Sequence, residues 1–178
     1  MQSFVPTIKP QDVLVLAKLI ILQNQEKSPQ KELAKSLGLS QAEVSNALTR
    51  LKMAGLLSDS KTHIKKLAAI EFIKHALKFM FPIRYSGMDR GILAGPSTAF
   101  VKEKVITSDG PDIIWQDSSG KNRGLCVGPI YPTVTFAVKK DPELYRLLTI
   151  IELFRGLGST RHLHVASIWL DEMVKGKE

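Results

Sequence analysis

Five side chains that form hydrogen bonds fall on one face of a predicted helix, residues 41–52. The opposite face carries Val44, Ala47, Leu48 and Leu51 at the spacing of a buried stripe. Hydroxyls, carboxamides and a guanidinium supply the donors and acceptors with which a protein recognises a polar surface. We therefore expect recognition by hydrogen bonding rather than catalysis. The outward residues are Gln41, Ser45, Asn46, Thr49 and Arg50.

Residues that could carry catalysis or bind a metal are scattered along the chain. His162 and His164 stand two positions apart, so they do not share a helix face. Ser97 and Ser118 lie in no recognisable nucleophile motif. Cys126 is the single cysteine, and we expect it to be a small apolar residue in a buried strand. The sequence therefore predicts no enzymatic activity, no metal and no cofactor.

The outward face belongs to a unit of two short helices, residues 28–57. Ser28 suits the cap of the first helix, and Gly38 suits the left-handed conformation that ends it. Ser40, with Glu43 three residues on, forms a capping box for the second helix. The two helices therefore meet at a tight turn, as in a helix-turn-helix.

This unit resembles the helix-turn-helix of bacterial transcriptional regulators, in particular the MarR-like and related winged-helix families. The resemblance implies that helix 41–52 lies in the major groove of double-stranded DNA. Gln41 and Asn46 would then pair with adenine, and Arg50 with guanine or phosphate. In those families a β-hairpin wing follows directly, but residues 58–63 are too short for one. The matching string is Leu33-Ala34, Leu37-Gly38-Leu39-Ser40, Val44-Ser45, Leu48, Leu51 and Gly55-Leu56-Leu57.

Positive charge is concentrated around this unit. The 178 residues carry a formal net charge of +8, and residues 27–78 hold 10 Lys and Arg against 4 Asp and Glu. A basic footprint around the reading helix is what contacts to DNA phosphates require. The lysines expected to hold phosphates are Lys31, Lys35, Lys52, Lys61, Lys65 and Lys66.

The chain after the helix-turn-helix changes in character twice. A long helix is predicted over residues 64–80, and residues 82–132 then hold 12 of the chain's 21 Gly and Pro residues, which predicts loops with short strands. Strands are expected at 112–116 and 124–127. The polar loop between them has two possible roles. It is either the tip of a hairpin, which would carry Lys121 and Arg123 to DNA like a displaced wing, or an exposed turn without such a role.

Two predicted helices, residues 10–25 and 144–154, are apolar on more than one face. A surface helix needs only one apolar stripe, so the C-terminal helices or a second subunit must cover the rest. We expect a homodimer, because two recognition helices must enter grooves about 34 Å apart on a two-fold operator.

The predicted fold is mainly α with a small β component. It has an N-terminal helix-turn-helix (winged-helix-like) domain, residues 1–81, and a C-terminal α+β region, residues 82–178, for dimerisation or for a protein partner or small-molecule effector. The most apolar run, residues 13–22, is too short to span a bilayer, so we expect no membrane contact and a cytoplasmic location. The predicted function is sequence-specific DNA binding in transcription regulation. The alternatives are an antitoxin-like or adaptor interaction module, and a binder of structured RNA.

Overall fold

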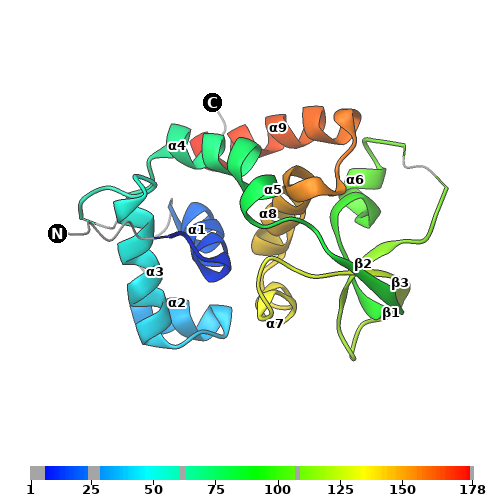
Figure 1. Cartoon of the computed structure of the whole chain (residues 1–178), viewed down its shortest axis with the longest axis horizontal. Helices are drawn as coiled ribbons and strands as arrows, with labels where there is room; N and C mark the ends of the chain where they lie inside the picture. The colour runs from blue at the N-terminus through cyan, green and yellow to red at the C-terminus, as the bar shows by residue number, and fades with distance from the viewer. Residues whose placement is uncertain (1–6, 24–28, 61–62, 107–108, 177–178) are drawn as a thin grey trace.

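The computed structural model describes residues 7–23, 29–60, 63–106 and 109–176. Helices dominate, with a small three-stranded sheet at the end of the molecule opposite α3 (Figure 1). This confirms the predicted fold class. The helices are α1 (Pro10–Leu22), α2 (Gln30–Leu37), α3 (Gln41–Met53), α4 (Lys66–Glu71), α5 (Leu77–Met80), α6 (Ala99–Lys102), α7 (Val134–Val138), α8 (Pro142–Glu152) and α9 (Thr160–Lys175). The strands are β1 (Tyr85–Leu93), β2 (Ile113–Gln116) and β3 (Asn122–Val127).

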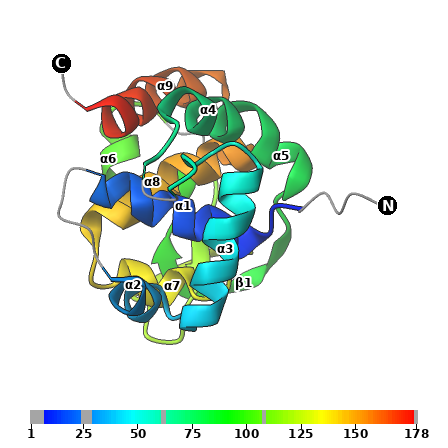
Figure 2. The ribbon, with the colours of Figure 1, turned by 90° about the vertical axis from the view of Figure 1, so that its left-hand side faces the viewer.

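Helix α1 lies at the centre of the molecule, in contact with α2, α3, α8 and α9 (Figure 2). Its residues 12–17 and Ile20 are all buried. Helix α8 is buried in the same core, and Lys18 of α1 bonds Asp141, the N-cap residue of α8, at 2.6 Å. The second apolar faces of both helices are therefore covered from within the chain. A second subunit is not needed to cover these faces. The apolar faces of α1 and α8 are therefore no evidence for a dimer, contrary to what the sequence suggested.

The predicted helix 64–80 is helical from Lys66 to Met80 but is not a regular α-helix. A π-helical segment, Phe72–Ala76, separates α4 from α5. Ile70, Ile73 and Leu77 are buried at spacings of three and four, whereas Leu67 at the start of the helix is 71% exposed. The extra residue per turn in a π segment shifts the buried stripe along the helix surface.

Strand β1 pairs antiparallel with both β2 and β3, and β2 pairs parallel with β3, so the three strands close into a barrel. The predicted strands 112–116 and 124–127 are confirmed, and Cys126 is buried in β3. The hairpin alternative is wrong, because β2 and β3 run parallel to each other, whereas the two strands of a hairpin are antiparallel. The glycine-rich stretch 84–95, for which the sequence predicted no strand, contains β1. Gly91 allows the close pairing, since a Cβ there would collide with the backbone of Trp115.

Arg155 forms a buried ion pair and also links segments that lie far apart in the chain. Arg155, in a π-helical segment that continues α8, donates to both carboxylate oxygens of Glu152 at 2.7 and 2.8 Å. Its other donors bind the carbonyl of Phe81, just after α5, at 2.7 Å and that of Gly128, just after β3, at 3.2 Å. Burial raises the pKa of Glu152 to about 7, although Arg155 opposes that shift.

Candidate nucleic-acid interface

The turn between α2 and α3 has the geometry that the sequence predicts. Gly38 is in the left-handed conformation, with φ of 65°, and its N–H donates to the carbonyls of Ala34 and Lys35. Ser40 and Glu43 form the capping box: the Glu43 N–H donates to the Ser40 hydroxyl at 3.2 Å, and the Ser40 N–H donates to the Glu43 carboxylate at 2.8 Å. These bonds lower the pKa of Glu43. The predicted Ser28 cap lies outside the described residues.

Helix α3 presents a polar face to solvent on the outside of the molecule (Figure 2). Gln41, Ser45 and Asn46 are exposed along it. Thr49 is half-buried, and its hydroxyl donates to the Ser45 carbonyl at 3.0 Å. The apolar face of the helix is buried against the core, as predicted. Four of the five residues named from the sequence therefore share an accessible surface.

Arg50, the fifth of these residues, does not point outward. Its Nε and Nη2 donate to the two oxygens of Asp12 in α1, at 2.7 and 2.6 Å. The Asp12 side chain is fully buried and also accepts the N–H of Lys9 at 2.9 Å. The prediction that Arg50 is an outward reading residue is wrong. A buried carboxylate needs a cation, and the guanidinium of Arg50 is committed to it.

The lysines expected to hold phosphates fall into three groups. Lys31, Lys35 and Lys65 are exposed and have no side-chain partner among the described residues. Lys52 lies 3.6 Å from the exposed carboxylate of Asp59. Lys66 is exposed, but its ammonium donates to the carbonyl of Lys175 in α9 at 3.0 Å. Lys61 lies outside the described residues.

A very short hairpin follows α3, where the sequence predicted none. Leu57 pairs antiparallel with Ile64 in a single β-bridge. The Ser58 N–H donates to the His63 carbonyl at 2.8 Å, and the Lys65 N–H donates to the Leu56 carbonyl at 2.9 Å. A hairpin thus occupies the place of a wing, although it is far shorter than the family pattern implies.

The C-terminal region contacts the helix-turn-helix at its turn. The edge of the Phe136 ring in α7 lies 3.0 Å from where a Cβ on Gly38 would be. The Tyr131 hydroxyl donates to Glu43 at 3.4 Å, and burial, together with the nearby Glu43 charge, raises the pKa of Tyr131. Sequence reasoning missed Tyr131 and Phe136, because no local pattern links residues about ninety positions apart.

Two helices joined through a left-handed glycine, the second capped and polar on its outer face, define a helix-turn-helix protein. The family model of the MarR family matches residues 16–63, so this part of the chain is MarR-like. The match runs from within α1 to the short hairpin. No curated protein and no solved structure matched the chain.

Within the described residues, no group of three His, Cys, Asp or Glu side chains is placed to hold a metal ion. Over the same part of the chain, every helix is too short or too polar to span a membrane.

Proposed function

We propose that the protein is a sequence-specific DNA-binding transcriptional regulator that reads the major groove with α3. The observation that carries the proposal is the exposed row of Gln41, Ser45 and Asn46 on a helix whose opposite face is buried. The MarR family match over the same residues supports a regulator rather than an enzyme.

The chemistry of this row fits the edges of base pairs. A carboxamide offers one acceptor and two donors side by side, which matches the N7 and N6 groups of adenine in the major groove. Gln41 and Asn46 both carry this group. The first helix of a helix-turn-helix crosses the DNA backbone, and α2 carries the exposed Lys31 and Lys35 for that contact.

Two substitutions separate base reading from phosphate contact. Asn46→Ala should weaken binding to the preferred duplex by about 1–3 kcal/mol and relax sequence preference at one position. Lys35→Ala should weaken binding to all duplexes alike and lower the slope of log affinity against log salt by about 1. The measurement is fluorescence anisotropy at several salt concentrations, with a duplex chosen by selection from random DNA.

Lys104→Ala is the matched control, because Lys104 is exposed and lies two residues after α6. Helix α6 lies far from α2 and α3 (Figure 1). Unchanged affinity and preference in Asn46→Ala would contradict the assigned reading face. Equal affinity for an A-form RNA duplex and for the selected DNA would favour the RNA alternative, since RNA helices are recognised by shape. Salt-insensitive co-purification with a stoichiometric protein would favour the interaction module.

We also propose that the protein binds DNA as a homodimer, because a two-fold operator presents two equivalent grooves. Light scattering of the DNA-bound protein should give two chains of 19.8 kDa per duplex. One chain per duplex at saturating protein concentration would overturn the dimer and leave the reading face as proposed.

A further inference from the structure

Two arginines lie directly opposite each other on the paired strands β1 and β3. Arg90 is the register partner of Arg123, and both side chains are exposed. Residues that are opposite in an antiparallel pair share one face of the sheet, with Cβ atoms about 4.5–5.5 Å apart. Like charges at that spacing destabilise the pairing unless an anion lies between them. These two residues are called the arginine pair below.

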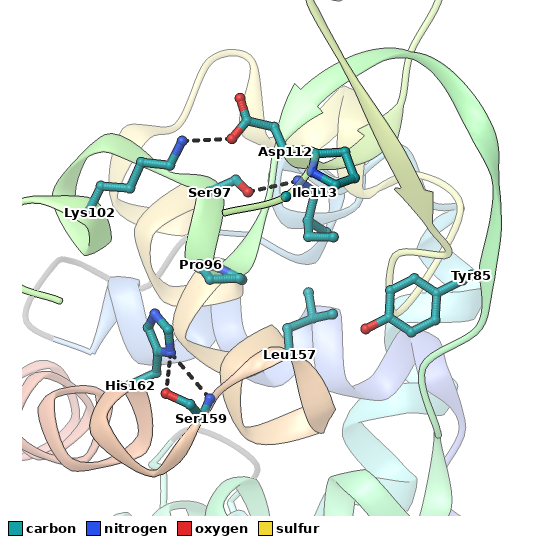
Figure 3. Close-up of a pocket in the computed structure, with 11 residues that line it drawn as sticks. Tyr85, Pro96, Ser97, Lys102, Asp112, Ile113, Leu157, Ser159 and His162 are labelled. Carbon is teal, nitrogen blue, oxygen red and sulfur yellow. Dashed lines mark hydrogen bonds and ion pairs between the residues drawn. The ribbon is translucent and has the colours of Figure 1, made fainter. Parts of the chain in front are cut away.

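The acidic side chains of the neighbouring segments are bound to other cations. At a cavity of about 290 Å³ beside the sheet, Asp112 accepts a bond from Lys102 at 2.6 Å (Figure 3). Asp117, in the loop after β2, pairs with Lys139, which follows α7, at 2.7 Å. Both carboxylates are therefore already neutralised, and neither is free to compensate the arginine pair.

The acid next to Arg90 in the chain does not neutralise it either. Asp89 is the preceding residue of β1, so its side chain lies on the opposite face of the strand. There it accepts a hydrogen bond from the Gln116 side chain at 2.6 Å. None of the ion pairs among the described residues includes either member of the arginine pair. Both positive charges are therefore available to an anion from outside the chain.

The arginine pair is linked to the helix-turn-helix through α7. This helix packs against α2, and Lys139 at its end binds Asp117 in the loop before β3. Figure 1 shows α2, α7 and the sheet in succession along the lower side of the molecule. Two more exposed lysines lie on these segments, Lys121 before β3 and Lys140 after α7. Exposed cations thus occur on adjoining segments from α2 to the arginine pair.

Position and chemistry narrow the class of anion. Strand β1 is exposed throughout residues 85–90, so the arginine pair lies on an open ribbon and not in an enclosed pocket. An open row of cations suits an extended polyanion. The planar donors of a guanidinium match phosphate oxygens two at a time. Double-stranded DNA carries one phosphate charge per about 1.7 Å of its axis, and it is the partner proposed above for the lysines of α2.

We propose that the arginine pair binds the phosphate backbone of the duplex that α3 reads, and that it does so without reading sequence. This inference rests on the proposed function, since it takes the same duplex as its partner. The contact is made by two paired strands that lie apart in the chain, and it places a second anchor on the DNA at the end of the molecule opposite α3.

The test is fluorescence anisotropy on the double variant Arg90→Gln with Arg123→Gln. Two duplexes of equal length are compared, one with the selected sequence and one with a random sequence. The double variant should bind both about tenfold more weakly at about 50 mM salt, and lower the slope of log affinity against log salt by about 2. The ratio of the two affinities should not change, whereas Asn46→Ala should lower that ratio.

The matched control is Lys104→Gln with Arg161→Gln, which removes the same charge from two exposed positions elsewhere. Arg161 belongs to α9, on the upper side of the molecule in Figure 1. The control should bind both duplexes within about twofold of the unaltered protein. Removing like charges from opposite strand positions should not lower the midpoint of thermal unfolding, so a loss of binding in the double variant is not a loss of fold.

Proximity to the DNA is tested with Arg123→Cys carrying a tethered iron chelate. The native Cys126 is buried, so the label is directed to position 123. The chelate should cut the backbone of the selected duplex at fixed positions. Absence of cutting would overturn the proposal, and so would a double variant that binds both duplexes as tightly as its control.

These outcomes are separable from failure of the regulator proposal. Loss of sequence preference in Asn46→Ala, with no effect of the double variant, would leave α3 as the reading element and reject the arginine pair. An unchanged preference in Asn46→Ala, with weakened binding of the double variant to both duplexes and cutting from position 123, would reject α3 and support the backbone contact.

Discussion

Arg50→Ala is expected to lower the free energy of unfolding by about 3–5 kcal/mol, the range for breaking a buried ion pair by removing one partner. Asp12 is fully buried, and Arg50 supplies both of its side-chain hydrogen bonds at 2.6 and 2.7 Å. The substitution leaves the carboxylate with only the Lys9 N–H as a donor among these contacts. Urea denaturation followed by tryptophan fluorescence measures the loss.

The double substitution Asp12→Leu with Arg50→Met is the decisive comparison, because it removes both charges and keeps apolar volume. It should recover most of the lost stability, since a buried pair replaced by packed apolar residues is often neutral or stabilising. Arg161→Ala, at an exposed arginine of α9, is the control for loss of an arginine. If Arg50→Ala is no less stable than Arg161→Ala, the pair does not stabilise the fold as we expect.

This expectation also changes how DNA binding should be tested. A loss of binding in Arg50→Ala would follow from a displaced or unfolded α3, and would not identify a contact to a base. Gln41, Ser45 and Asn46 are exposed, so their substitution tests the reading face without that ambiguity.

Arg155→Met is the second substitution expected to have a large effect, again about 3–5 kcal/mol. Glu152 is fully buried, and Arg155 is its ion-pair partner as well as the donor to the carbonyls of Phe81 and Gly128. Methionine retains part of the apolar stem and removes every donor. The change therefore isolates the hydrogen bonds and charge that join the end of α5 to the segment after β3.

The stability lost in Arg155→Met should depend on pH. The pKa of Glu152 is raised to about 7 from an ordinary value of 4.5, so the folded state holds a proton that the unfolded state releases. The free energy of unfolding therefore falls as Glu152 ionises, while pH rises from about 4.5 to about 7, and below that range Glu152 causes no such loss. Arg155 favours the charged form, so its removal raises the pKa further.

Urea denaturation of Arg155→Met at pH 5 and pH 8 should show the larger loss at pH 8. Glu152→Gln combined with Arg155→Met removes the titrating group and should give a similar loss at both values. A loss in Arg155→Met that is equal at pH 5 and pH 8 would contradict the role assigned to Glu152.

The parts of the site that sequence predicts are those held together by neighbours in the chain. Gly38 ends α2 because of its own conformational freedom, and Ser40 caps α3 through Glu43, three residues away. Such contacts leave a local pattern. Arg50 and Asp12 are 38 residues apart, so their pairing leaves no local pattern in the sequence. An arginine on a polar helix face was therefore predicted to be free to contact DNA.

The β region shows the same limit. Strands β2 and β3 have the residue types of strands, and their positions follow from composition. Strands β2 and β3 run parallel because each pairs antiparallel with β1. Strand β1 spans Tyr85–Leu93 and contains Gly87 and Gly91. Glycine weakens the interior of a strand, so the sequence predicted no strand in that stretch. The close backbone approach at Gly91 explains its presence, and it is visible only in three dimensions.

The contact between Lys18 and Asp141 has a consequence for the order in which the protein is made. The two residues are 123 positions apart, and α1 is buried partly against α8, which Asp141 caps. A ribosome adds about 5–20 residues each second, so α1 is synthesised roughly 6–25 s before its partner helix. Throughout that interval the apolar surface of α1 lacks part of its cover. Helix α1, on which α2 and α3 pack, is thus fully covered only after most of the remaining chain has been translated.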